Sequence, residues 1–330
     1  MGGMAGFMYR QLTFTPKPLP SSITLDGKTA IVTGGNTGLG LEAAKEMARH
    51  GISRVILGVR TVSKGEAAKS EIVAQSPNCD VLVWKLDQES FSSMHAFSER
   101  VVQELDCLAI VILCAGVKLL EYIKSENTGH EMNVQVNHIG TALLSLLLLG
   151  PLQKTANANP GQKTRLTIVT SEVHFWTRFE AKDAPNILAR LDEPSSFGEG
   201  MDRYNTSKLL NILWLRELSS VLGPDVIVNG VNPGLCASTL HRSDTTPGIA
   251  IFNKIFAWSS EQGGHNLVDA AIQHATDQGV YISEQVVKKP SSFVLSPQGK
   301  QAQTKLWNET ITLLQEALPG IDLLSPLLTM

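Results

Sequence analysis

Tyr204 and Lys208 are the residues of this chain whose types and spacing point most directly to chemistry. They stand four residues apart in the run YNTSK, and this spacing puts both side chains on one face of a helix. An ammonium group beside a phenol stabilises the phenolate, so we expect Lys208 to lower the pKa of Tyr204. A tyrosine tuned in this way acts as a general acid or base toward a carbonyl or an alcohol. Ser171, which follows the apolar run RLTIVT, is predicted to hydrogen-bond the same substrate oxygen.

The run TGGNTGLG at residues 33–40 predicts a loop that binds a nucleotide cofactor. It joins an apolar, β-branched segment (29–33) to a helix-forming segment (41–50). Glycine permits the tight turn and a close approach of backbone to pyrophosphate, and a helix N-terminus offers free N–H groups. The alternative is a glycine turn with a structural role only. The residues predicted to bind the cofactor here are Thr33, Gly34, Asn36, Thr37, Gly38, Leu39 and Gly40.

Residues at the ends of the following strands bear on which cofactor binds. Arg60 stands where many dinucleotide-binding folds carry a carboxylate for the adenosine ribose, and an arginine there accommodates a 2′-phosphate. We therefore expect NADP rather than NAD, with Lys64 as an auxiliary contact. The alternative for Arg60 is a solvated surface position. Asp87 either accepts a hydrogen bond from the adenine amino group or caps the next helix, and both interpretations stay open.

The segment CAG at 114–116 ends a further strand. Ala115 and Gly116 are small enough to let the chain pass close to the cofactor ribose. Because no cationic neighbour in the local sequence lowers the thiol pKa of Cys114, we interpret it as a small buried side chain rather than a nucleophile.

These residues need a scaffold in which strands and helices alternate. Strands are expected at 29–33, 55–59, 81–86, 108–113, 165–170 and 226–231, and helices at 41–50, 64–75, 90–105 and 134–149. Such alternation predicts one doubly wound α/β Rossmann domain over 26–290, with a parallel sheet flanked by helices. Pro16, Pro18 and Pro20 predict an extended lead-in over 1–25 rather than a helix. Residues 291–330 are expected to form a C-terminal extension that packs on the domain.

Composition narrows the function classes. The 330 residues are 43% hydrophobic and 18% charged, with net charge -3, which excludes a disordered chain and argues against bulk nucleic-acid binding. Four scattered cysteines predict neither a disulfide scaffold nor a zinc site, and favour a reducing, cytoplasmic location. The apolar run at 139–149 is shorter than the ~20 residues of a membrane span, so we expect a buried or interface helix. No dense cluster of histidines and carboxylates indicates a metal.

Together these motifs resemble the short-chain dehydrogenase/reductase family over roughly residues 26–240. Thr33, Gly34, Gly38 and Gly40 match its cofactor loop, and Ser171, Tyr204 and Lys208 match its catalytic residues. The resemblance implies that Tyr204 transfers the proton and that Lys208 holds the nicotinamide ribose. It further implies that Asn137 holds a proton-relay water through its backbone. Pro233 and Gly234, with Thr239 behind them, correspond to the turn that closes over the nicotinamide.

Within the family, GVR and the following SKGEAAK resemble the retinol-dehydrogenase and WW-domain-oxidoreductase-like branch, whose members favour NADP. The lead-in YRQLTFTPKPLP is similar to stand-alone reductases of fungal secondary metabolism, which implies a secondary-metabolite ketone as substrate. The chain departs from the family pattern at 113–116, where LCAG replaces Asn-Asn-Ala-Gly. The interval between Ser171 and Tyr204 and the C-terminal part are also longer than usual.

The substrate pocket is expected to come from residues 172–203 and 235–264, which carry many aromatic and aliphatic side chains. Such a lining favours a bulky lipophilic substrate. His174 either touches this substrate or is a structural histidine. We expect an NADPH-dependent oxidoreductase that interconverts a carbonyl and an alcohol. The alternatives are non-redox chemistry on the same fold and a cofactor-binding partner protein without turnover. The apolar helices near 139–149 and 209–222 can pair two copies into a homodimer, or the C-terminal extension covers them.

Overall fold

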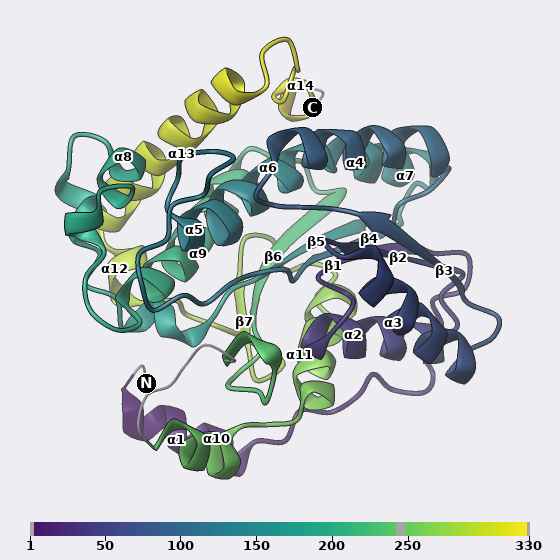
Figure 1. Ribbon diagram of the computed structural model, residues 1–330. Helices are drawn as coiled ribbons and strands as arrows, with labels where there is room; N and C mark the ends of the chain where they lie inside the picture. Colours follow the sequence, from purple (N-terminus) through teal and green to yellow (C-terminus); the bar gives the residue numbers. More distant parts are fainter. Residues whose placement is uncertain (1–2, 242–247, 329–330) are drawn as a thin grey trace.

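The computed structural model describes residues 3–241 and 248–328, in which eight strands form one sheet (Figure 1). The strand order is β3-β2-β1-β4-β5-β6-β7-β8, and every neighbouring pair is parallel except β7 and β8. The strands are β1 (Thr29–Thr33), β2 (Arg54–Val59), β3 (Asp80–Lys85), β4 (Ile110–Leu113), β5 (Thr164–Val169), β6 (Val226–Asn232), β7 (Tyr281–Ser283) and β8 (Val286–Lys288). The predicted α/β Rossmann fold is confirmed, and the two short strands at the end were not predicted.

Helices cover both faces of the sheet, as Figure 1 shows. One layer contains α2 (Gly38–Arg49), α3 (Val62–Gln75) and α11 (Ser260–Ile272), and the other contains α4 (Phe91–Glu104), α6 (Gly140–Leu147), α7 (Leu149–Ala158) and α9 (Asp202–Ser220). Each layer buries its own apolar cluster against the sheet. This is why the central strands are apolar on both faces, the pattern of a covered parallel sheet.

The helix expected at 134–149 is longer and is irregular at its start. It comprises α5 (Met132–Val134), a π-helical turn η1 (Gln135–Ile139), then α6 and α7. The whole segment from 132 to 158 is long and apolar enough to cross a bilayer by composition, yet 89% of its most apolar window is buried inside the domain. Of the two predicted alternatives, a buried or an interface helix, the structure shows the buried one within this chain, and α7 packs against β5 and β6.

The N-terminal segment differs from the expected extended lead-in. Residues 4–13 form a helix, α1 (Met4–Thr13), and the chain is extended only from Phe14 onward. The physical reason is that all three prolines lie beyond the helix, so the run MAGFMYRQLT has no residue that breaks it. Its buried residues Phe7 and Gln11 face the domain, and the helix lies beside α10 (Ile249–Phe256).

The segment between Ser171 and Tyr204 is a series of short helical turns: η2 (Glu172–Phe175), η3 (Glu180–Asp183), α8 (Ile187–Leu191) and η4 (Pro194–Ser196). A further turn, η5 (Thr239–His241), follows β6. Beyond β8, the chain forms α12 (Ser292–Leu295), α13 (Pro297–Ala317) and α14 (Ser325–Leu328).

The C-terminal extension packs on the domain through α13, which lies against α8 and α9. Trp307 of α13 stacks on Trp214 of α9 with ring centroids 4.5 Å apart, and Leu306 and Leu314 join the same apolar cluster. Within one chain α13 thus covers part of the apolar α9 surface. Pairing of two copies through residues 209–222 stays a prediction.

Candidate active site

The turn between β1 and α2 has the geometry of a phosphate cradle. Gly34 and Gly38 have φ angles of +69° and +56°, a backbone region that residues other than glycine rarely adopt. A Cβ atom at Gly40 would lie 2.7 Å from the carbonyl oxygen of Gly34, so the turn closes only with glycine there. The side chain of Thr37 makes no capping hydrogen bond to α2. The first N–H groups of α2 are therefore left for a pyrophosphate, and the residues fit a dinucleotide cofactor.

The cradle opens into a cavity of about 650 Å³ at the carboxyl ends of the parallel strands. The cavity gathers predicted residues that lie far apart in the sequence. These are Gly34, Asn36, Thr37, Gly38, Leu39, Gly40, Arg60, Lys64, Asp87, Ala115, Gly116, Ser171, Tyr204, Lys208, Pro233, Gly234 and Thr239. Thr33 and Asn137 are not among the lining residues.

Thr33 acts behind the cavity. Its hydroxyl oxygen accepts hydrogen bonds from the backbone N–H groups of Cys114 and Ala115, both at 3.0 Å, and the residue is fully buried. The Thr33 side chain therefore does not line the cavity, and its predicted direct contact with a cofactor is corrected to a supporting role. Because the bond joins the end of β1 to the end of β4, Thr33 fixes the two strands that form the floor of the cradle.

Asn137 also supports the cavity from behind. Its side-chain amide donates to the carbonyl oxygen of Val117 at 2.8 Å and to the hydroxyl of Ser207 at 2.9 Å. It thereby joins the loop after β4 to helix α9. The residue lies in η1, and a π-helical turn frees backbone carbonyls from the regular helical pattern. This geometry fits the backbone role that the resemblance implies.

Arg60, Thr61 and Lys64 line the cavity where α3 begins. Arg60 is solvent-exposed and lines the cavity, so its guanidinium is accessible to an anionic group. The cap of α4 is Ser90, whose hydroxyl accepts from the N–H of Ser93, and not Asp87. Asp87 lines the cavity, while one of its carboxylate oxygens accepts from the N–H of Glu89 at 3.1 Å.

Helix α9 carries Tyr204 and Lys208 into the cavity. The Lys208 ammonium lies 5.8 Å from the centroid of the Tyr204 ring and donates to the carbonyl oxygen of Val169 at 3.0 Å. The expected lowering of the Tyr204 pKa is wrong for this structure. Burial raises the Tyr204 pKa above its ordinary value of 10, and burial lowers the Lys208 pKa to about 8. Tyr204 is only 6% exposed, so desolvation disfavours the charged phenolate. Tyr204 is consequently protonated at neutral pH.

Ser171 is held by His174, which proves to be structural. The hydroxyl of Ser171 lines the cavity and accepts from the N–H of Val173 at the start of η2. His174 Nδ1 donates to the backbone carbonyl of Ser171 at 2.7 Å, and Nε2 accepts from the N–H of Ser291 at 3.1 Å. Burial lowers the pKa of His174 to about 4, so the ring is neutral and both nitrogens are satisfied.

Cys114 lines the cavity as a thiol rather than a thiolate. Burial raises its pKa to about 11, although the Lys208 cation partly opposes the rise. This agrees with the interpretation of Cys114 as a small side chain rather than a nucleophile, but the residue is only partly buried and not fully buried as predicted.

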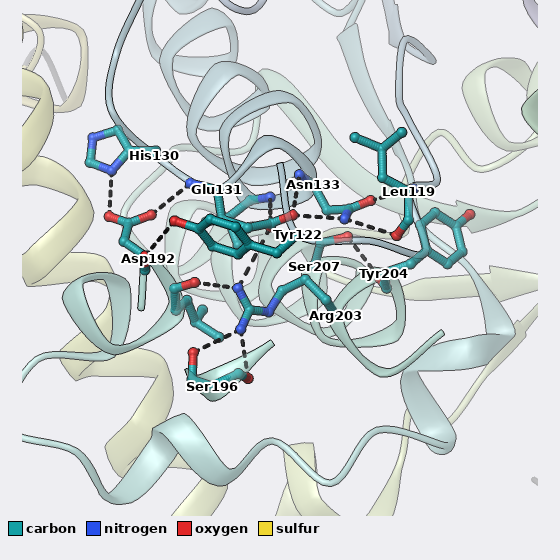
Figure 2. Close-up of polar contacts among 12 residues, drawn as sticks. Leu119, Tyr122, His130, Glu131, Asn133, Asp192, Ser196, Arg203, Tyr204 and Ser207 are labelled. Carbon is teal, nitrogen blue, oxygen red and sulfur yellow. Dashed lines mark hydrogen bonds and ion pairs between the residues drawn. The ribbon is translucent and has the colours of Figure 1, made fainter. Parts of the chain in front are cut away.

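A buried polar network behind Tyr204 was missed by sequence reasoning (Figure 2). The Arg203 guanidinium donates to the carbonyl oxygens of Leu191 and Ser196 and lies 3.7 Å from a Glu131 carboxylate oxygen. Glu131 in turn accepts from the N–H groups of Asn133 and Val134. The network ties the start of α9 to the 172–203 segment and to α5. Its partners are distant in sequence, so no local motif could have revealed it.

Comparison with known proteins agrees with this geometry. The family model described as short chain dehydrogenase matches residues 28–162. The chain is 69% identical to short chain dehydrogenase sol3 of Alternaria solani over 289 residues, which are 88% of this chain and 100% of that protein. This chain belongs to the short-chain dehydrogenase family.

A second relative, short chain dehydrogenase/reductase dmxR8 of a Cryptosporiopsis species, is 36% identical over 96% of this chain and 98% of its own length. The predicted membership and the similarity to fungal short-chain dehydrogenases are thus confirmed, and the protein is an oxidoreductase. The Pseudomonas aeruginosa RhlG/NADP active-site complex superimposes with a TM-score of 0.62 at 20% identity, covering 80% of this chain and 97% of that one. At this identity the likeness shows the shared fold.

Proposed function

We propose that this short-chain dehydrogenase uses NADPH to reduce the carbonyl group of a bulky lipophilic ketone or aldehyde. The observation that carries the proposal is the placement of Tyr204, as a neutral phenol, in the same cavity as the glycine cradle. A cofactor bound to the cradle supplies the hydride to the carbonyl carbon. Tyr204 donates its proton to the carbonyl oxygen, which leaves an alcohol.

The neighbours of Tyr204 support this direction of proton transfer. Ser171 presents its hydroxyl to the cavity, where it can donate a hydrogen bond to the developing alkoxide. The Lys208 ammonium stabilises the tyrosinate that remains after transfer, and it has a partner in the Val169 carbonyl that fixes its position. Asn137 keeps α9 in register with the loop after β4 through Ser207 and Val117.

The proposed preference for NADPH rests on two positively charged residues of the cavity lining. Arg60 and Lys64 are cationic, and no carboxylate follows Arg60 before Glu66. An arginine fork binds a phosphate in a bidentate manner. Replacement of Arg60 by Leu should weaken NADPH binding roughly 10- to 100-fold, the worth of a charge-assisted contact, and should leave NADH binding unchanged. Arg100→Leu, on the surface of α4, is the matched control. Equal losses for both cofactors would refute the role of Arg60.

The apolar lining supports a lipophilic substrate. Leu119, Trp176, Leu240, Ile249 and Phe252 all contribute to the cavity. Together with the similarity to fungal relatives, this lining supports an intermediate of secondary metabolism as the natural substrate. We extend the proposal to a cytoplasmic location, because the four cysteines are all free thiols.

The test is NADPH oxidation against a panel of lipophilic ketones, together with cofactor titration followed by fluorescence. Tyr204→Phe removes the proton donor and keeps the ring, so turnover should fall about 10²- to 10⁴-fold while the Kd for NADPH is unchanged. Tyr9→Phe, at an exposed position on α1, should behave as wild type. Tight NADPH binding without any cofactor oxidation would refute the reductase and favour non-redox chemistry.

A further inference from the structure

Helix α1 forms one wall of the cavity that contains Tyr204. Met4 and Phe7 of α1 line this cavity. Figure 1 shows α1 beside α10 at one end of the domain. The segments expected to build the substrate pocket, 172–203 and 235–264, both begin more than a hundred residues later in the sequence. The wall formed by α1 is therefore an addition to the predicted pocket.

Phe7 is the centre of an aromatic group that joins three segments of the chain. Its ring meets Trp176, the residue after η2, edge to face at a centroid distance of 5.5 Å and an angle of 88°. It also stacks on Phe252 of α10 at 6.4 Å and 15°. Trp176 and Phe252 themselves line the cavity, and Phe7 is only 7% exposed. The group thus presents a continuous apolar surface to whatever occupies this part of the cavity.

Gln11 fastens α1 to the segment that follows the Pro233-Gly234 turn. Its amide nitrogen donates to the carbonyl oxygens of Leu235 and Phe256 at 2.9 and 2.8 Å, and its amide oxygen accepts from the N–H of Leu235. The Trp258 indole donates to the Gln11 carbonyl at 2.9 Å. The Gln11 residue is only 6% exposed and all of these bonds reach segments far along the chain, so they hold the helix in one position.

Arg10 fastens the same helix to the Ser171 side of the cavity. Its guanidinium pairs with Glu172, the residue after Ser171, and lies 3.5 Å from Glu284. A Cβ atom at Gly234 would lie 2.9 Å from the Gln11 amide oxygen, which shows how closely the turn packs on α1. Helix α1 is therefore fixed relative to both segments that flank the reacting carbonyl.

We propose that α1 forms a substrate subsite for an apolar ring or chain remote from the carbonyl group, with Phe7 as its specificity-determining residue. This inference rests on the proposed carbonyl reduction. An apolar group of the substrate packs against the rings of Phe7, Trp176 and Phe252 while the carbonyl oxygen lies at Tyr204. Substrates without such a group do not reach α1, so their reduction does not depend on Phe7.

The experiment compares cyclohexanone with cyclohexanones that carry a hexyl or a phenyl group on the carbon opposite the carbonyl. Phe7→Ala should lower kcat/KM for the substituted ketones roughly 10- to 100-fold, mostly through KM, because a large buried apolar contact is lost. Its kcat/KM for cyclohexanone and its Kd for NADPH should match those of the wild type. Phe7→Leu should give an intermediate loss. Leu12→Ala changes the same helix at a side chain that is 61% exposed, and it should match the wild type with every ketone.

Equal losses for substituted and unsubstituted ketones, or no loss for either, would overturn the subsite. Should Phe7→Ala fail to fold, Phe7→Leu decides by the same comparison. If the wild type does not oxidise NADPH with any of the ketones tested, the proposed function fails. The subsite is then judged by binding of phenyl-substituted cyclohexanone to the NADP-loaded protein, followed by tryptophan fluorescence. Binding of this ketone that is weaker than the wild type's in Phe7→Leu but not in Leu12→Ala supports the subsite, and equal binding in the two variants refutes the subsite.

Discussion

The buried ion pair of Arg203 and Glu131 allows a test of how strongly burial raises the unfolding free energy that is lost when one member of an ion pair is removed. Arg203 and Glu131 have side chains that are 1% and 0% exposed, and their closest charged atoms lie 3.7 Å apart (Figure 2). Arg203→Met keeps the unbranched stem of the side chain and removes its charged end. Glu131 would then be a buried carboxylate without a cation.

The expected loss of unfolding free energy is about 3–5 kcal/mol, which is typical when one member of a buried pair is removed. Since domains of ordinary stability have about 5–15 kcal/mol in total, this loss is a large share. The carbonyl oxygens of Leu191 and Ser196 lose their guanidinium donor as well. Glu131→Gln combined with Arg203→Met removes the stranded charge and should recover about 1–3 kcal/mol.

Urea unfolding followed by circular dichroism measures these differences. The matched control is the exposed pair of Arg54 and Asp80, whose side chains are 38% and 46% exposed and whose atoms are closer, at 2.7 Å. Arg54→Met should cost less than about 1 kcal/mol despite the shorter distance. If Arg203→Met were as mild as Arg54→Met, or if the double variant were no more stable than Arg203→Met, the argument from burial would be refuted.

Two further predictions concern the cradle and pH. Gly40→Ala should cost about 1–3 kcal/mol of unfolding free energy and weaken NADPH binding, because its Cβ atom would lie 2.7 Å from a backbone oxygen. The control is Gly150→Ala, which has open space around it. It should be neutral or slightly stabilising in the same urea titration. Burial lowers the pKa of His174 to about 4 and of His138 to about 3, from an ordinary 6.5. The unfolded chain therefore takes up protons below pH 6.5 that the folded chain does not, and each histidine should cost about 1.5 kcal/mol of stability between pH 6.5 and 5. Unfolding at several pH values checks this, and His174→Gln should make the loss of stability below pH 6.5 smaller by the contribution of that one histidine.

Local patterns were enough to predict the glycine turn after β1 and the placement of Tyr204 and Lys208 on one helix. The glycine spacing at 34–40 lies within one strand-to-helix turn, and Tyr204 and Lys208 lie on one helix, so neighbouring residues alone fix their relation. Strands β1 to β6 followed from their apolar runs for the same reason. Strands β7 and β8 escaped prediction because each has only three residues, too few to show a period.

Burial and long-range packing decided what the sequence left open or got wrong. The Tyr204 pKa depends on how completely the folded chain removes water from the phenol, and the spacing to Lys208 carries no information about that. Asp87 and Ser90 both suit a helix cap, and only the backbone path shows that Ser90 takes this role.

The sequence by itself determined the Rossmann fold, the cofactor cradle and the pairing of Tyr204 with Lys208, since each depends on residues that are close along the chain. Only the tertiary structure decided that residues 4–13 are a helix against the cavity that contains Tyr204, because Gln11 and Arg10 find their partners in segments far along the chain. It also decided that Glu131 supports the helix of Tyr204, since burial creates that ion pair and no local pattern encodes it.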